Sequence, residues 1–157
     1  MSKHILARAR ICLEIAKLSN CERGKVGAVI INPKSFTILA DGYNGGPRGM
    51  CGDFCGGDTC TRTDLGIASG DNVQIGCHHA EMNALGNAGR NGVTTLDMAM
   101  ITSCEPCVMC AKLIHHAGIS SVYVISDTYP CKEGVEYLGR VGIWVKPIAI
   151  DQLVEGG

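Results

Sequence analysis

The chain has 157 residues, of which 46% are apolar, and a formal net charge of −1. This length suits one domain over residues 1–157 with a sizeable core, and no apolar run is long enough to cross a membrane. The near-neutral charge argues against a polynucleotide partner, because nucleic-acid binders usually carry a basic face.

The chain contains ten cysteines, which would suggest disulfides in a secreted protein. Its start leads into an amphipathic segment that contains arginines, which is not the pattern of a secretory signal. We therefore expect a cytoplasmic protein whose thiols serve metal chemistry.

The first forty residues predict a helix followed by a strand pair. Apolar residues recur at helical spacing over 2–18, and Ser2 can cap this helix. Residues 26–31 form a continuous apolar run that is typical of a buried strand. A turn at 32–35 leads into a second strand over 36–40, so the pair predicts a hairpin.

Residues 41–76 are the least regular part of the chain. They are rich in glycine and contain Cys51, Cys55 and Cys60. Loops of this length are usually functional or held in place by another group. We expect a Cys/Gly-rich insertion at about 45–77 that a metal holds.

The rest of the chain alternates helices and strands. The predicted helices span residues 79–88, 106–116 and 134–141. The predicted strands span residues 96–102, 122–125 and 143–148. In the first of these helices Met82 and Leu85 are expected to face inward; Pro106 opens the second, and Gly118 stops it. This order predicts an α/β sandwich with its site at the carboxyl ends of the strands.

Two short motifs offer metal ligands. His79 lies two residues before Glu81, and Cys107 and Cys110 lie three apart behind a proline. One imidazole and two thiolates suit zinc and leave a fourth tetrahedral position for water, as in catalytic zinc sites. Glu81 is then the carboxylate placed to manage the protons of that water.

The H-x-E and P-C-x-x-C pair is the signature of zinc deaminases, and the chain resembles the cytidine deaminase superfamily. Within it, the chain is most similar to deoxycytidylate (dCMP) deaminases. That similarity extends from about Ala9 to Pro147 and rests on three runs: His79-Ala80-Glu81-Met82-Asn83-Ala84, Lys25-Val26-Gly27-Ala28-Val29-Ile30 and Gly42-Tyr43-Asn44-Gly45.

The resemblance implies a fold and an activity. The fold is a three-layer α/β/α sandwich around a mixed five-stranded sheet. The activity is hydrolytic deamination of dCMP to dUMP, which feeds thymidylate synthesis, with dCTP as activator, dTTP as inhibitor and a homohexameric assembly. Glu81 moves protons between the attacking water, ring N3 and the leaving ammonia.

The resemblance also assigns residues around the substrate. It places the Ala80 N–H at the base O2 and Asn44 near the sugar and phosphate, although a plain turn would also explain Asn44. Tyr129 could stack on the base. Arg48 and Arg90 are candidate phosphate contacts for an effector, although exposed arginines are usually only solvated.

Some dCMP deaminases hold a second, structural zinc. Cys21, Cys51 and Cys77 match the positions of its ligands, and the fourth ligand is Cys60 or Cys55. A set of four cysteines would suit a closed structural site.

Two other functions compete with this interpretation. The run Glu105-Pro106-Cys107 is more similar to tRNA-adenosine, guanine or cytosine deaminases than to most dCMP deaminases. A zinc-ribbon-like binding module without catalysis would explain the cysteine-rich loop, but it would not explain Glu81 beside an open three-ligand set.

Four further residues could be mistaken for metal ligands but have simpler explanations. The H-x-E spacing selects His79, which leaves His78 as a neighbour. His115 and His116 suit the end of a helix. Cys104 is expected to be an ordinary buried thiol.

Overall fold

The core of the structure is a five-stranded sheet in the order β2-β1-β3-β4-β5. This computed structural model describes residues 1–49, 60–68, 75–125 and 132–154. The strands are β1 (Gly27–Ile31), β2 (Ile38–Tyr43), β3 (Ala99–Thr102), β4 (Ser121–Ile125) and β5 (Trp144–Ile148). β1 runs antiparallel to both β2 and β3, whereas β3, β4 and β5 are parallel. The predicted hairpin and the mixed sheet are confirmed.

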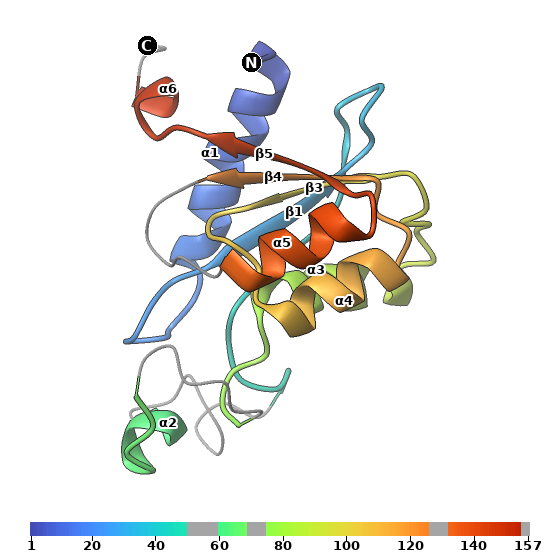
Figure 1. Cartoon of the computed structure of the whole chain (residues 1–157). Coiled ribbons are helices and arrows are strands. Elements are labelled where there is room, and N and C mark those ends of the chain that lie inside the picture. Colours follow the sequence, from blue (N-terminus) through green and yellow to red (C-terminus); the bar gives the residue numbers. More distant parts are fainter. Residues whose placement is uncertain (50–59, 69–74, 126–131, 155–157) are drawn as a thin grey trace.

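Helices cover both faces of the sheet (Figure 1). One face carries α1 (Lys3–Lys17) and the short α6 (Asp151–Val154), and the other carries α3 (Ala80–Arg90), α4 (Val108–His116) and α5 (Lys132–Arg140). The strand side chains alternate accordingly, because successive residues point to opposite faces. Ile30 and Met100 pack in one core and Ile31 and Ile101 in the other. The predicted three-layer sandwich is therefore confirmed, with a further short helix, α2 (Thr61–Asp64), in the insertion. No helix of the described ranges is long and apolar enough to cross a membrane.

The helix ends follow their capping residues. Ser2 accepts a hydrogen bond from the His4 N–H at the start of α1, as predicted. Gly118, at φ +74°, ends α4: its N–H donates to His115 O, and the Ile119 N–H donates to Ile114 O. These two bonds form a Schellman motif, in which glycine takes the left-handed conformation cheaply.

The structure corrects three local predictions. α4 begins at Val108 and not at Pro106, because Cys107 is extended and its sulfur caps the helix by accepting the Cys110 N–H. Met82 is 40% exposed and not inward-facing, since Ala84, two residues on and nearly opposite around the helix, faces the sheet. The second strand starts at Ile38 because a turn built on Asn32 extends further than predicted.

α3 packs directly on the outer strand β2. Asn83 and Asn87, one helical turn apart, donate side-chain hydrogen bonds to Tyr43 O and Asp41 O, both at 2.7 Å. Between these carbonyls lies Gly42, where an added Cβ would collide with the α3 backbone at Ala84 N and Ala80 O. Gly42 is therefore required for the close approach of α3, the helix that directly follows His79.

Gly42→Ala should lower the free energy of unfolding by about 2 kcal/mol or more, because the clash is with backbone that cannot rotate away. Gly86, inside α3, is the matched control: an added Cβ there meets no atom within 4 Å in the described residues. Gly86→Ala should raise stability by about 0.5–1 kcal/mol. Urea unfolding of both variants measures the difference, and a Gly42→Ala protein as stable as wild type would contradict the packing argument.

Candidate metal centre

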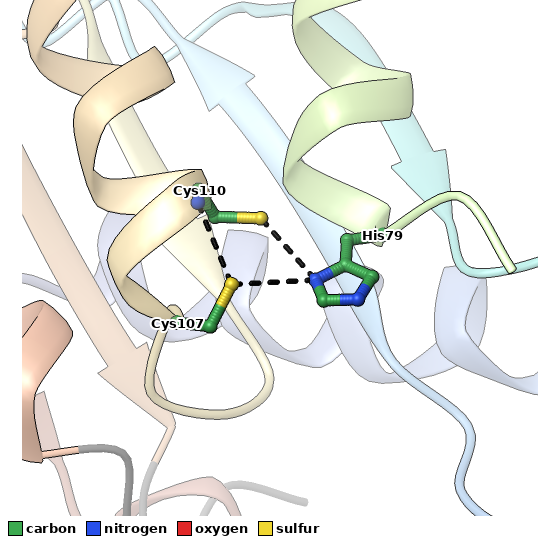
Figure 2. A group of neighbouring side chains, drawn as sticks. All are labelled: His79, Cys107 and Cys110. Atoms are coloured by element: carbon green, nitrogen blue, oxygen red, sulfur yellow. Dashed lines mark hydrogen bonds between the residues drawn. The ribbon is translucent and has the colours of Figure 1, made fainter. Parts of the chain in front are cut away.

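The three predicted metal ligands lie at the starts of two neighbouring helices. His79 is the residue before α3, and Cys107 is the residue before α4. The segment before α4 leaves the carboxyl end of β3, which ends at Thr102. Figure 2 shows His79 facing the two cysteines across the gap between the helices.

The distances among the three donor atoms suit one tetrahedral metal ion. His79 Nδ1 lies 3.5 Å from Cys107 Sγ and 3.4 Å from Cys110 Sγ, and all three donor atoms lie within 4.8 Å of one another. Zn–N and Zn–S bonds of ordinary length place tetrahedral ligands about 3.3–3.8 Å apart. His79 is exposed, Cys107 half-buried and Cys110 buried, so the fourth position would lie on the solvent side.

The three donor groups shift one another's pKa values through their hydrogen bonds. A hydrogen bond from the Cys110 thiol lowers the pKa of Cys107 to about 4, against the opposing effect of burial, and His79 adds to the lowering. The pKa of Cys110 is raised, because this same hydrogen bond and burial keep its proton in place. The hydrogen bond to Cys107 raises the pKa of His79. A bound cation would release these protons, because ligands must be deprotonated.

Glu81 lies beside this centre and is 3% exposed. Burial raises the pKa of its carboxyl group, although its own backbone N–H and the charge of His79 oppose the shift. A carboxyl group shifted in this direction can both take up and release a proton closer to neutral pH. Ala80, fully buried, is the first residue of α3. Its N–H has no partner within the helix and is available at this end.

Asn44 holds the scaffold near the site. Its side-chain oxygen accepts the Val26 N–H at 2.8 Å, and its side-chain N–H donates to Gly24 O at 2.9 Å. Gly45, next to it, pairs by two backbone hydrogen bonds with His78. Asn44 thus fixes the loop before β1, and its contact with a sugar or phosphate stays a prediction.

The other predicted site residues are spread more widely. Arg48 donates to Asn87 Oδ1 at 2.8 Å, and Arg90 is exposed at the end of α3. His78 is exposed, and His115 and His116 lie in the last turn of α4. Cys104 is half-buried, where a buried thiol was expected. Tyr129, Cys51 and Cys55 lie outside the described residues.

The structure groups only His79, Cys107 and Cys110 as a metal-ligand set within the described residues. Cys21 and Cys77 are half-buried and Cys60 is buried. These three candidate ligands of a second zinc do not form such a set in the described part of the chain.

Arg62, which lies in α2, belongs to no motif that the sequence analysis singled out. The Cys107 hydrogen bond raises the pKa of His79, whereas the Arg62 guanidinium acts in the opposite direction. Its positive charge is therefore a minor influence on His79, opposing the rise in the pKa. Because Arg62 lies 17 positions before His79 and shares no motif with it, spacing could not have indicated it.

Comparison with known proteins agrees with the geometry. Residues 2–126 match the profile of the cytidine and deoxycytidylate deaminase zinc-binding region. ComE operon protein 2 of Bacillus subtilis is 32% identical over 142 residues, covering 89% of this chain and 68% of that protein. Deoxycytidylate deaminase of Saccharomyces cerevisiae is 36% identical over 138 residues, covering 87% of this chain but 42% of the yeast protein.

A solved structure covers nearly the whole fold. The dCMP deaminase of cyanophage S-TIM5, in complex with dCMP and dUMP, superposes with a TM-score of 0.76 at 28% identity. The match covers 94% of this chain and 99% of the phage protein. The resemblance predicted from the sequence is confirmed: the chain belongs to the zinc-binding cytidine and deoxycytidylate deaminase family.

Proposed function

We propose that the chain catalyses the hydrolytic deamination of dCMP to dUMP with one catalytic zinc. The observation that carries the proposal is the set of three donor atoms, His79 Nδ1, Cys107 Sγ and Cys110 Sγ, beside the buried carboxyl group of Glu81. The yeast and cyanophage relatives, both named as dCMP deaminases, support the choice of substrate.

His79, Cys107 and Cys110 would hold the zinc. Bound there, the ion would supply a Lewis acid that makes water nucleophilic near neutral pH. Glu81 takes a proton from the attacking water and delivers it to ring N3 while the oxygen bonds to C4. Glu81 then takes a second proton from the new C4 hydroxyl and passes it to the amino nitrogen, so that the C4–N bond breaks, a C4 carbonyl forms, and ammonia leaves. The Ala80 N–H holds the base by its O2.

A base deaminase acting on tRNA adenosine, guanine or cytosine is the second candidate. The observation in its favour is Glu105, which precedes Pro106 and Cys107 as in those enzymes. Its Oε2 atom is buried and has no hydrogen-bond partner in the described residues. Such an oxygen can accept a donor from a ligand, which makes the identity of the base a matter for experiment.

The test is ammonia release from dCMP, tRNA, guanine and cytosine by protein whose zinc content has been measured. Turnover of dCMP alone supports the proposal. Turnover of guanine, cytosine or tRNA without dCMP would transfer the proposal to the second candidate.

We propose Arg62, whose charge acts on His79, as the cation that binds the monophosphate. Arg62→Ala should then raise the KM for dCMP about 10-fold, because a hydrogen bond to a charged group contributes about 1.5–3 kcal/mol. The KM for deoxycytidine, which has no phosphate, should stay the same. Arg140→Ala, at the exposed end of α5, is the control. An equal rise in KM for dCMP and for deoxycytidine would show that Arg62 does not bind the phosphate.

We further propose the properties that the resemblance to dCMP deaminases implies. These are activation by dCTP, inhibition by dTTP, a homohexamer, a cytoplasmic location and a role in feeding thymidylate synthesis. Arg48 and Arg90 remain the proposed effector contacts, and Tyr129 remains the proposed stacking residue. dCMP saturation curves with and without each nucleotide test the regulation.

A second, structural zinc is also proposed on the resemblance. Cys21, Cys51 and Cys77 would hold it, with Cys60 or Cys55 as the fourth ligand. A metal content of about two zinc ions per chain would support this second site. A content of about one zinc ion per chain would rule out the second site and leave the proposal of a catalytic zinc unchanged.

A further inference from the structure

The loop that carries Cys107 is tied to the start of β1 through Ser103. The Gly27 N–H donates to Ser103 Oγ at 2.9 Å, and the Ser103 N–H donates to Gly27 O at 3.0 Å. These two bonds continue the β1–β3 pairing one residue past Thr102, at the point where β3 ends. Ser103 therefore ties the start of the loop that carries Cys107 to the sheet.

Both partners of this contact are themselves fixed. Ser103 is 8% exposed, and its hydroxyl satisfies a Gly27 N–H that is buried. Gly27 O also accepts the Cys12 thiol at 3.3 Å, and an added Cβ at Gly27 would lie 2.9 Å from Ala16 N of α1. Gly27 cannot move without displacing α1, so it is a rigid anchor for the loop.

A second bond shapes the same turn. Thr102 Oγ1 donates to Cys104 O at 2.7 Å, directly after the strand. Thr102 is fully buried, so this bond is shielded from water. The side chains of Thr102 and Ser103 thus set the path of the two residues between β3 and Glu105.

The same stretch of chain also reaches His79. Val26, which precedes Gly27, donates its N–H to Asn44 Oδ1, and Gly45 pairs with the backbone of His78. A short path of hydrogen bonds therefore connects the histidine segment to the cysteine segment. Its link on the cysteine side is the pair Gly27 and Ser103.

We propose that Ser103 is a positioning residue that sets the place of Cys107 relative to His79, through its two hydrogen bonds to Gly27. Its hydroxyl is bound to Gly27, and it is not one of the three metal donors grouped in the described residues. The proposal rests on the proposed function for its effect on turnover, whereas its effect on metal binding is independent of the substrate.

Ser103→Ala removes the acceptor and leaves the buried Gly27 N–H unpaired. We expect zinc affinity, measured by competition with a chelator, to fall about 10-fold to 100-fold, as when groups that orient metal ligands are lost. The visible absorption bands of the Co²⁺-loaded protein should change, because they report ligand geometry. With dCMP, kcat should fall by a similar factor while KM stays the same.

Three further variants make the result decisive. Ser103→Thr keeps the hydroxyl and should restore affinity and spectrum. Thr102→Val, an isosteric change, removes the bond from Thr102 Oγ1 to Cys104 O in the same turn and should also alter the Co²⁺ spectrum. This variant replaces Ser103→Ala in the test if Ser103→Ala does not fold. Ile148→Val shortens a core side chain on the face of the sheet that α1 covers and shows the effect of a stability loss alone.

Wild-type zinc affinity and Co²⁺ spectrum in Ser103→Ala would overturn the proposal, and so would equal losses in Ile148→Val. If Ser103→Ala does not fold, an unchanged spectrum in Thr102→Val overturns it. If the wild-type protein does not turn over dCMP, the proposed function fails, but the metal-binding comparison still decides the role of Ser103.

Discussion

Glu81→Gln should reduce kcat for dCMP by at least about 10³-fold, within the range that a positioned acid–base group contributes. Glutamine fills the same buried space but cannot take a proton from water or return one to the leaving amino group. Because the metal donors His79, Cys107 and Cys110 are untouched, zinc content should stay at the wild-type value. Steady-state ammonia release together with metal analysis measures both quantities.

Glu133→Gln is the matched control, because Glu133 is an exposed carboxylate in the first turn of α5. It should turn over at the wild-type rate. A Glu81→Gln protein within 10-fold of wild type would show that another group moves the protons. If instead the wild-type chain binds zinc but deaminates none of the candidate substrates, the non-catalytic zinc module is the better interpretation.

His79→Ala should lose the catalytic zinc and with it the deaminase activity. The remaining donors, Cys107 and Cys110, are two thiols at the start of one helix. Two protein ligands are too few for a catalytic zinc, which normally has three. We expect the zinc content to fall by about one ion per chain and turnover to fall to background. The measurement is metal content after dialysis, followed by the dCMP assay.

His78→Ala provides an adjacent histidine for comparison. Its side chain is exposed, and its backbone hydrogen bonds to Gly45 survive the substitution. It should keep both zinc and activity. Loss of zinc in His78→Ala with retention in His79→Ala would reverse the ligand assignment made from the H-x-E spacing.

Local spacing was sufficient to predict the grouping of the three donor side chains and most of the sheet. One helical turn separates Cys107 from Cys110, so both sulfurs point to one side, and His79 reaches them because its helix lies beside theirs. The order of strands and helices likewise predicted the layers, because buried strands have continuous apolar runs.

The scaffold that holds the centre could not be predicted in this way. Ser103 and Gly27 are 76 positions apart, and Asn44 and Val26 are 18 apart. These are bonds from side chains to backbone, which carry no periodic signal in the sequence. The exposure of Met82 depends on which side of α3 meets the sheet, and that is decided by the close contact with Gly42.

The two outer strands of the sheet are both protected against pairing with another chain. The carbonyls of Asp41 and Tyr43 in β2 are occupied by asparagines of α3. β5 carries Pro147, which has no N–H to offer, and Lys146 beside it. Unprotected strand edges promote fibrous aggregation. Joining the sheets of two copies edge to edge is therefore disfavoured at both outer strands.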